Sequence, residues 1–251
     1  MENLKKYCIL YEMSISNYRS VKKMDIGKIV KAELSGWKKW EIGWMFFCSA
    51  AIIVLSLLLK DNWLGIISAL TSTWYALWAG KGKMSCYFFG IINSFCYGLI
   101  SYNYKLFGEV MLNWGYYLPM MFVGLFFWRK HLDSKQEIYK TKLSFKGRIL
   151  LVLLAAAGIA AYAALLKFIG GRTPGLDSLT TVLSVAAMVM TVKRCVEQWF
   201  LWTVVNIASI IMWLRVYMQD GGAVASLLMW CIALVNGIIF YVQWSKEVKN
   251  G

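Results

Sequence analysis

Two stretches of this chain follow one pattern, KGKMSCYFFGIINSFCYGLISYNYKLFGEVMLNWGYYLPMMFVGLFFW over residues 81–128 and RCVEQWFLWTVVNIASIIMWLRVYMQDGGAVASLLMWCIALVNGIIFYVQW over residues 194–244. Three pairs lie 113 residues apart and two tryptophan pairs lie 116 apart: Lys81 with Arg194, Asn93 with Asn206, Gly108 with Gly221, Trp114 with Trp230, and Trp128 with Trp244. Chance produces single matches in a chain with 13 tryptophans. Five ordered pairs with one insertion instead favour a duplicated unit.

The composition places the chain in a lipid bilayer. It is 59% hydrophobic and 16% charged, whereas a soluble domain is about 25% charged. A helix crosses a bilayer with about 20 mainly apolar residues, and eight segments fit that description: 42–59, 62–79, 86–104, 109–128, 149–166, 176–192, 198–218 and 222–244. We therefore predict an all-α integral membrane protein of one domain with eight transmembrane helices.

The repeat predicts how these helices are grouped. The expected order is a cytoplasmic or interfacial segment (1–41), an additional N-terminal helix (42–59), a three-helix repeat (62–128), a linker helix (149–166) and a second three-helix repeat (176–244). Three helices leave the chain on the opposite side of the membrane, and the single linker helix returns it. The two bundles are therefore predicted to be parallel, and such repeats are typical of transporters that bind their substrate between the two copies.

Basic residues predict the orientation. With both termini in the cytoplasm, only five of the 27 lysines and arginines fall outside: Lys60, Lys105, Lys167, Arg172 and Arg215. This asymmetry follows the positive-inside rule. The net charge of +14 is then explained by an anionic membrane surface, without a nucleic-acid partner. Residues 1–35 are polar and mixed, so no cleavable signal peptide is predicted.

The strongest candidate for a ligand site is a stripe on the seventh segment. Gln198, Trp202, Asn206, Ser209 and Trp213 recur at spacings of four, four, three and four residues, so they share one helix face. Amides and indoles on one stripe can hydrogen-bond to a flat polar ligand and stack on it. Polar groups at membrane depth are costly without a partner, which makes them natural functional candidates.

Other polar residues extend this candidate site to both repeats. Asn93 and Tyr97 lie one turn apart on the third segment, and Asn93 is the repeat mate of Asn206, so the two amides are expected to face each other across the pseudo-axis. Tyr117 and Asn236, on the last helix of each repeat, complete the set. The alternative for a single buried Asn is a hydrogen bond to a neighbouring helix, worth about 1 kcal/mol.

Residues near the segment ends have other expected roles. Glu109, Asp177 and Arg215 are expected to reach the headgroups. Six tryptophans are expected to form the interfacial belt: Trp44, Trp63, Trp114, Trp128, Trp230 and Trp244. Pro119, within the fourth segment, should leave a backbone carbonyl without its partner and bend the helix.

Several function classes are disfavoured by missing residues. The centres of the segments contain no Asp, Glu, His, Lys or Arg to carry a proton or bind a coupling ion. The chain also lacks an HExxH motif, a P-loop and a Ser/His/Asp set, while its single histidine and six scattered cysteines suggest no metal site. We therefore predict neither an enzyme nor a cofactor, and favour passive, facilitated movement of a solute.

Two runs resemble the PnuC family of nicotinamide riboside transporters: Tyr87-Phe88-Phe89-Gly90-Ile91-Ile92-Asn93, followed by Tyr97 and Gly98, and Val196-Glu197-Gln198-Trp199-Phe200-Leu201-Trp202, followed by Asn206 and Ser209. The resemblance covers about residues 62–245. It implies a fold similar to the SWEET transporters, a homotrimer, and uptake across the bacterial inner membrane down a gradient, with trapping by a separate cytoplasmic kinase. It places Asn93, Gln198, Trp202 and Asn206 at the substrate, whereas Met120 and Met121 occupy a region where some relatives carry an amide.

The residue chemistry agrees with a ligand of this kind. Indole faces can hold a pyridinium ring by stacking and cation–π attraction of about 2 kcal/mol, and amides can bind a carboxamide and ribose hydroxyls. Without a deep arginine, the site is expected to reject the phosphorylated mononucleotide. Alternatives remain: a transporter for thiamine, riboflavin or a sugar, or a membrane scaffold or receptor subunit that transports nothing.

Overall fold

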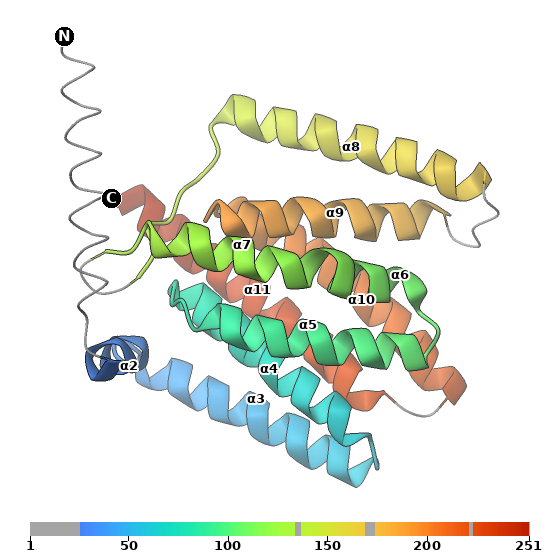
Figure 1. The fold of residues 1–251 in the computed structure, drawn as a ribbon, viewed down its shortest axis with the longest axis horizontal. Coiled ribbons are helices and arrows are strands. Elements are labelled where there is room, and N and C mark those ends of the chain that lie inside the picture. The colour runs from blue at the N-terminus through green and yellow to red at the C-terminus, as the bar shows by residue number, and fades with distance from the viewer. Residues whose placement is uncertain (1–25, 134–136, 169–173, 221–222, 251) are drawn as a thin grey trace.

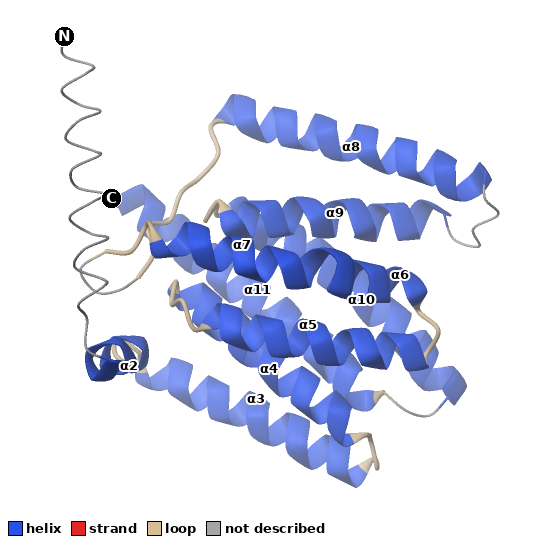
Figure 2. Cartoon of the chain, in the orientation of Figure 1, coloured by secondary structure: helices blue, strands red, loops and turns tan. Residues whose placement is uncertain are grey.

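The computed structural model describes residues 26–133, 137–168, 174–220 and 223–250. Within these ranges the chain is helical apart from turns, loops and two isolated β-bridges (Figures 1 and 2). Residues 1–25 of the predicted N-terminal segment, and Gly221 of the repeat, lie outside the described residues.

Every segment expected to be apolar and helical coincides with a helix. A short helix, α2 (Ile26–Leu34), precedes them, and the helices are α3 (Lys39–Leu58), α4 (Trp63–Lys81), α5 (Cys86–Asn103), α6 (Phe107–Val110) continued by η1 (Met111–Tyr117) and α7 (Leu118–Arg129), α8 (Phe145–Phe168), α9 (Pro174–Val192), α10 (Glu197–Asp220) and α11 (Val224–Asn250). By length and composition, five of the described helical stretches can cross a membrane: 39–58, 107–129, 145–168, 197–219 and 224–249. The protein is therefore a multi-pass, all-α membrane protein.

The two three-helix units pack against each other in a reciprocal way. The first helix of each unit contacts the last helix of the other, since α4 packs on α11 and α9 packs on α7. Figure 1 shows that α4 and α9 run in the same direction, as do α5 and α10. The additional helices are also equivalent, because α3 packs on α4 and α8 packs on α9. The sequence pattern did not indicate this last correspondence.

Three of the tryptophans expected in an interfacial belt form contacts inside the bundle instead. Trp128 and Trp244 have no exposed surface, and each indole donates to a backbone carbonyl of the other bundle. Trp230 donates to the hydroxyl of Tyr97 at 3.1 Å. Trp63, by contrast, is 69% exposed, as expected of a residue at the membrane surface. The belt prediction is thus wrong for Trp128, Trp230 and Trp244, because an indole N–H at a helix end can also bind a neighbouring helix.

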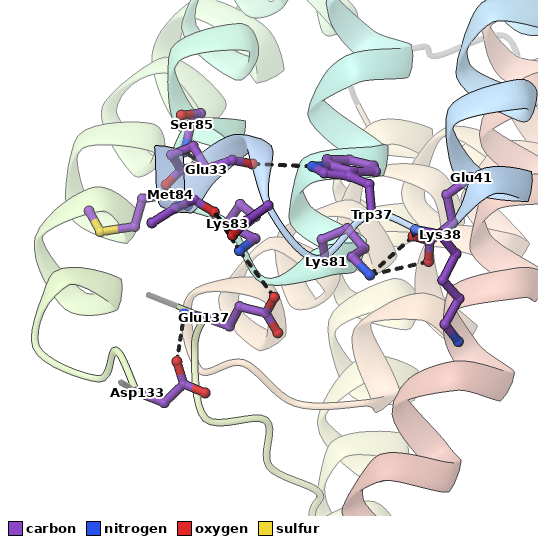
Figure 3. A network of polar contacts seen from close by, with 12 residues as sticks. Glu33, Trp37, Lys38, Glu41, Lys81, Lys83, Met84, Ser85, Asp133 and Glu137 are labelled. Atoms are coloured by element: carbon purple, nitrogen blue, oxygen red, sulfur yellow. Dashed lines mark hydrogen bonds and ion pairs between the residues drawn. The ribbon is translucent and has the colours of Figure 1, made fainter. Parts of the chain in front are cut away.

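Ionic contacts gather at the end of the bundle where α2 and the C-terminal end of α11 lie (Figures 1 and 3). The carboxylate of Glu41, which is almost fully buried, forms an ion pair with the ammonium group of Lys81 at 3.1 Å. Lys83 is fully buried and pairs with Glu137 at 3.1 Å. Buried charges are tolerated when they are paired. These contacts join α3 and the 137–144 segment to the end of α4 and the turn after it.

The same network holds α2 against the turn between α4 and α5. The carboxylate of Glu33 accepts hydrogen bonds from the backbone N–H groups of Met84 and Ser85, at 3.2 and 3.4 Å. Lys83 donates to the carbonyl of Ala32 at 2.9 Å. Since the first N–H groups of a helix lack partners within that helix, Glu33 supplies acceptors near the start of α5.

Candidate functional site

A cavity of about 100 Å³ lies between the two bundles, the region in which the repeat predicts a substrate site. Its walls include side chains of α4, α5 and the α6–η1–α7 stretch from the first unit, and of α9, α10 and α11 from the second. It has room for several water molecules. Sites that enclose drug-sized ligands are larger, at roughly 300 Å³ or more, so a nucleoside requires the surrounding side chains to move apart.

Six of the nine predicted site residues line this cavity: Asn93, Tyr97, Tyr117, Gln198, Trp202 and Asn206. The repeat mates Asn93 and Asn206 therefore share one cavity. The first three residues of the α10 stripe, Gln198, Trp202 and Asn206, line the space between the bundles.

The other three predicted residues lie outside the lining. Ser209 and Trp213 continue the α10 stripe beyond the cavity, and the fully buried Trp213 donates to the hydroxyl of Tyr97 at 2.6 Å. Asn236 lies beside the cavity-lining Gly237, but its Oδ1 accepts from Trp44 of α3 at 2.8 Å. Helical spacing places Ser209 and Trp213 on the same face as Gln198, but spacing cannot tell where along a helix a cavity ends.

The three predicted amides of the lining form few hydrogen bonds within the protein, which leaves part or all of each amide available. Asn93 accepts a hydrogen bond through Oδ1 from the hydroxyl of Ser68 at 3.0 Å, so its NH₂ group remains available to donate to a ligand. Gln198 donates a hydrogen bond through Nε2 to the carbonyl of Cys195 at 3.1 Å, so its Oε1 remains available to accept from a ligand. Asn206 forms no side-chain hydrogen bond to any described residue. Together the three amides offer both donors and acceptors to a ligand.

Aromatic rings form the apolar part of the wall. Trp202 donates to the hydroxyl of Thr191 at 3.1 Å, and its ring lies 5.9 Å from that of Tyr117 at a tilt of 53°. The hydroxyl of Tyr75 and the indole nitrogen of Trp199 are buried in the cavity wall without a hydrogen-bond partner among the described residues. An unpaired buried donor costs about 1–3 kcal/mol. A ligand with acceptor groups would reduce that cost.

Sequence reasoning missed the other five aromatic, amide or carboxylate side chains of the lining: Tyr75, Glu109, Asn113, Trp199 and Trp230. A signal existed for two of them. Glu109, Asn113, Tyr117 and Met121 recur every four residues and all line the cavity. Within this stretch, Met111–Tyr117 form the π-helix η1, which ends two residues before Pro119. Single turns of π-helix are frequent at functional sites, and here the turn carries Asn113 and Tyr117.

Glu109 also corrects an expectation about charge. It lines the cavity, whereas its position near a segment end predicted contact with headgroups. Among the described residues that line the cavity, no lysine, arginine or histidine is present. The cavity wall therefore carries one acidic side chain and no basic one.

The chain also matches known proteins. Residues 62–246 match the model of a family described as nicotinamide mononucleotide transporter. The nicotinamide riboside transporter PnuC of Neisseria mucosa is 35% identical over 227 residues, which is 88% of this chain and 86% of that protein. The Haemophilus influenzae protein of the same name is 32% identical, over 86% of this chain and 94% of that protein.

A solved structure shares the fold as well. The crystal structure of the vitamin B3 transporter PnuC superposes with a TM-score of 0.82 at 34% identity, and the match covers 90% of this chain and 99% of that one. The family is one of membrane transporters rather than enzymes. On the match over residues 62–246 and on these relatives, the chain belongs to the PnuC family.

Proposed function

We propose that this chain is a facilitative transporter that takes up nicotinamide riboside across the bacterial inner membrane, with the ligand bound in the cavity between the bundles. Two relatives carry the name of a transporter for this riboside. The cavity lies between parallel repeats, as substrate sites of such transporters do, and its amides and indoles suit a flat ring with a carboxamide and a ribose.

The charge of the cavity favours the riboside over the mononucleotide, although the family description names the mononucleotide. A phosphate group taken out of water needs charged or hydrogen-bonding donors, and Arg or Lys usually supplies them. The described lining contains neither of these residues and contains one glutamate. This is the observation that carries the choice of substrate. We expect the mononucleotide to be excluded.

Each part of the ligand has a matching group in the proposal. The pyridinium ring stacks against Trp202, opposite Tyr117, where cation–π attraction adds to stacking. Asn206, Gln198 and Asn93 bind the carboxamide and the ribose hydroxyls. Trp213 and Asn236 act indirectly in this scheme, through their hydrogen bonds to Tyr97 and Trp44. Ser209 has no role in it, because it also lies outside the cavity lining.

Transport requires the cavity to open. Its volume of about 100 Å³ is below that of typical ligand sites, so we propose that the two bundles rock about the α4–α11 and α9–α7 contacts to admit and release the solute. In this scheme all eight long helices span the membrane, both termini are cytoplasmic, and three copies assemble. The solute moves down its gradient and is trapped by a separate cytoplasmic kinase.

Binding and uptake measurements with the purified protein test the proposal. We expect calorimetry to detect the riboside and to detect no binding of the mononucleotide, thiamine or riboflavin. Trp202→Ala and Asn206→Ala should abolish binding while the melting temperature stays close to that of the native protein. Ser209→Ala, on the same helix but outside the cavity, is the matched control and should retain affinity.

Two results would contradict the proposal. Equal affinity for the riboside and the mononucleotide would refute the argument from charge, and unchanged affinity in both alanine variants would place the site elsewhere. Uptake into proteoliposomes tests the facilitative mode, which predicts that accumulation stops when the inside and outside concentrations are equal. Accumulation beyond that point would show coupling to another gradient.

A further inference from the structure

Glu109 is the single formally charged side chain among the described residues that line the cavity. It lies in α6, directly before the π-helix that carries Asn113 and Tyr117. Its backbone carbonyl accepts a hydrogen bond from Nδ2 of Asn113 at 2.9 Å, so one turn of helix fixes its place beside the other lining residues. Glu109 is thus part of the wall that a bound solute would contact.

The Glu109 carboxylate differs from those of two other buried or half-buried glutamates, Glu41 and Glu197. Glu41 is paired with Lys81, and Glu197 with Arg148. Within the described part of the chain, the carboxylate of Glu109 has neither an ion pair nor a hydrogen bond. The charged group that interacts with it is Asp177, which has the same sign. Glu109 therefore lacks the counter-charge that the other two glutamates have.

This arrangement has a direct consequence for ligand selection. A carboxylate removed from water without a cation is costly, and the cost falls when a positive charge enters the same enclosed space. A cation in the cavity would gain from this attraction, a neutral solute of the same shape would not, and a phosphorylated solute would be repelled. Hydrogen bonds and stacking alone would not distinguish the three by charge, and cation–π attraction to Trp202 would favour the cation without repelling a phosphate.

We propose that Glu109 is the counter-charge that makes the cavity selective for solutes carrying one fixed positive charge, such as a pyridinium ring. The inference deepens the proposed function and rests on it, because it assumes that the solute binds in this cavity. Glu109 then determines specificity, while Trp202 and the amides determine the shape of the ligand that fits.

The test compares two ligands of almost the same shape on native protein and on Glu109→Gln. Nicotinamide riboside carries the positive ring, and its reduced dihydro form is uncharged. We expect Glu109→Gln to lower the affinity for the riboside by about tenfold or more, equivalent to about 1.4 kcal/mol. The affinity of Glu109→Gln for the dihydro form should stay within about twofold of the affinity of native protein for that ligand. Glu247→Gln is the matched control, since the same substitution removes a largely exposed carboxylate near the C-terminal end of α11, outside the lining, and it should change neither affinity.

The outcomes separate this inference from the proposed function. If native protein binds neither ligand, the proposed function itself fails. If native protein binds the riboside and Glu109→Gln binds it equally well, only the role of Glu109 is refuted. A parallel loss for both ligands would also refute it, because such a loss would report altered shape rather than charge. Melting curves of each variant establish that the fold is retained.

Discussion

The indole nitrogen of Trp244 donates a hydrogen bond to the carbonyl oxygen of Gly80, with 2.6 Å between the two atoms. Trp244 belongs to α11 of the second unit and Gly80 to α4 of the first. The repeat mate of Trp244, Trp128 on α7, donates to the carbonyl of Thr191 on α9 at 3.1 Å. Equivalent indoles therefore join the last helix of each unit to the first helix of the other, which is the contact expected if the duplicated units are related by a pseudo-twofold axis.

Replacing Trp244 with Phe should destabilise the contact between the bundles. The change removes the hydrogen bond and leaves the carbonyl of Gly80 without its indole partner, for a loss of about 1–3 kcal/mol. Thermal melting of the detergent-solubilised protein measures it. Trp63→Phe is the control and should have little effect, because Trp63 is largely exposed. A melting temperature as low for Trp63→Phe as for Trp244→Phe would show that the indole bond is unimportant.

Gly80→Ala should separate α4 from α11. A methyl group on Gly80 would lie 2.3 Å from ring atoms of Phe240, which is far closer than van der Waals contact allows. Overpacking of this kind costs about 1–3 kcal/mol. Gly43→Ala in α3 is the matched control, because its methyl group would meet nothing within 4 Å. The expected result is a lower melting temperature for Gly80→Ala alone; equal melting curves would mean that the ring of Phe240 moves aside freely.

Helix positions were predictable because hydrophobicity alone determines which segments avoid water. The stripe of Gln198, Trp202 and Asn206 was predictable for a related reason, since helical spacing defines a face. Depth along a helix has no such signature, and Ser209 lies past the end of the cavity. Glu109 was misplaced because a residue near a segment end faces either headgroups or a cavity, and only packing decides between them.

Tyr97→Phe should reduce stability more than it reduces affinity. Although Tyr97 lines the cavity, its hydroxyl accepts from Trp213 at 2.6 Å and from Trp230 at 3.1 Å. Both lone pairs are therefore occupied by the protein. Losing the acceptor leaves two indole N–H groups unpaired, at about 1–3 kcal/mol for each that remains buried. Melting and calorimetry together check this expectation. A large loss of affinity at unchanged stability would instead make the hydroxyl a ligand contact.

Docking of α2 should depend on pH through Glu33. Burial raises the pKa of Glu33 above its ordinary value of 4.5, and hydrogen bonds from Ser85 and Met84 together with the charge of Lys83 lower it only in part. Because the docked state favours the protonated form, docking is strongest below pH 4.5 and weakens as the pH rises through the raised pKa of Glu33.

Hydrogen exchange of the α2 backbone measures this dependence. Glu33→Gln keeps an acceptor for Met84 and Ser85 but cannot ionise, so its protection should show no such decline over the same pH range. Comparing the two proteins at each pH cancels the intrinsic pH dependence of exchange. The amides of α8, recorded in the same samples, should behave alike in both proteins. A decline of the same size in Glu33→Gln would assign the effect to another group.

Pro119→Ala should weaken ligand binding without unfolding the protein. Proline has no N–H, so it cannot complete the i→i−4 bond of a regular helix, and the π-helix η1 ends two residues before it. Alanine restores the donor and allows η1 to relax toward an α-helix, which would turn Glu109 and Asn113 away from their present alignment with Tyr117. We expect a loss of affinity for the riboside of about tenfold, equivalent to about 1.4 kcal/mol. Gly115→Ala is the matched control within η1, since its methyl group meets nothing within 4 Å. Full affinity in Pro119→Ala would mean that packing against α5 and α9 holds the π-helix without help from the proline.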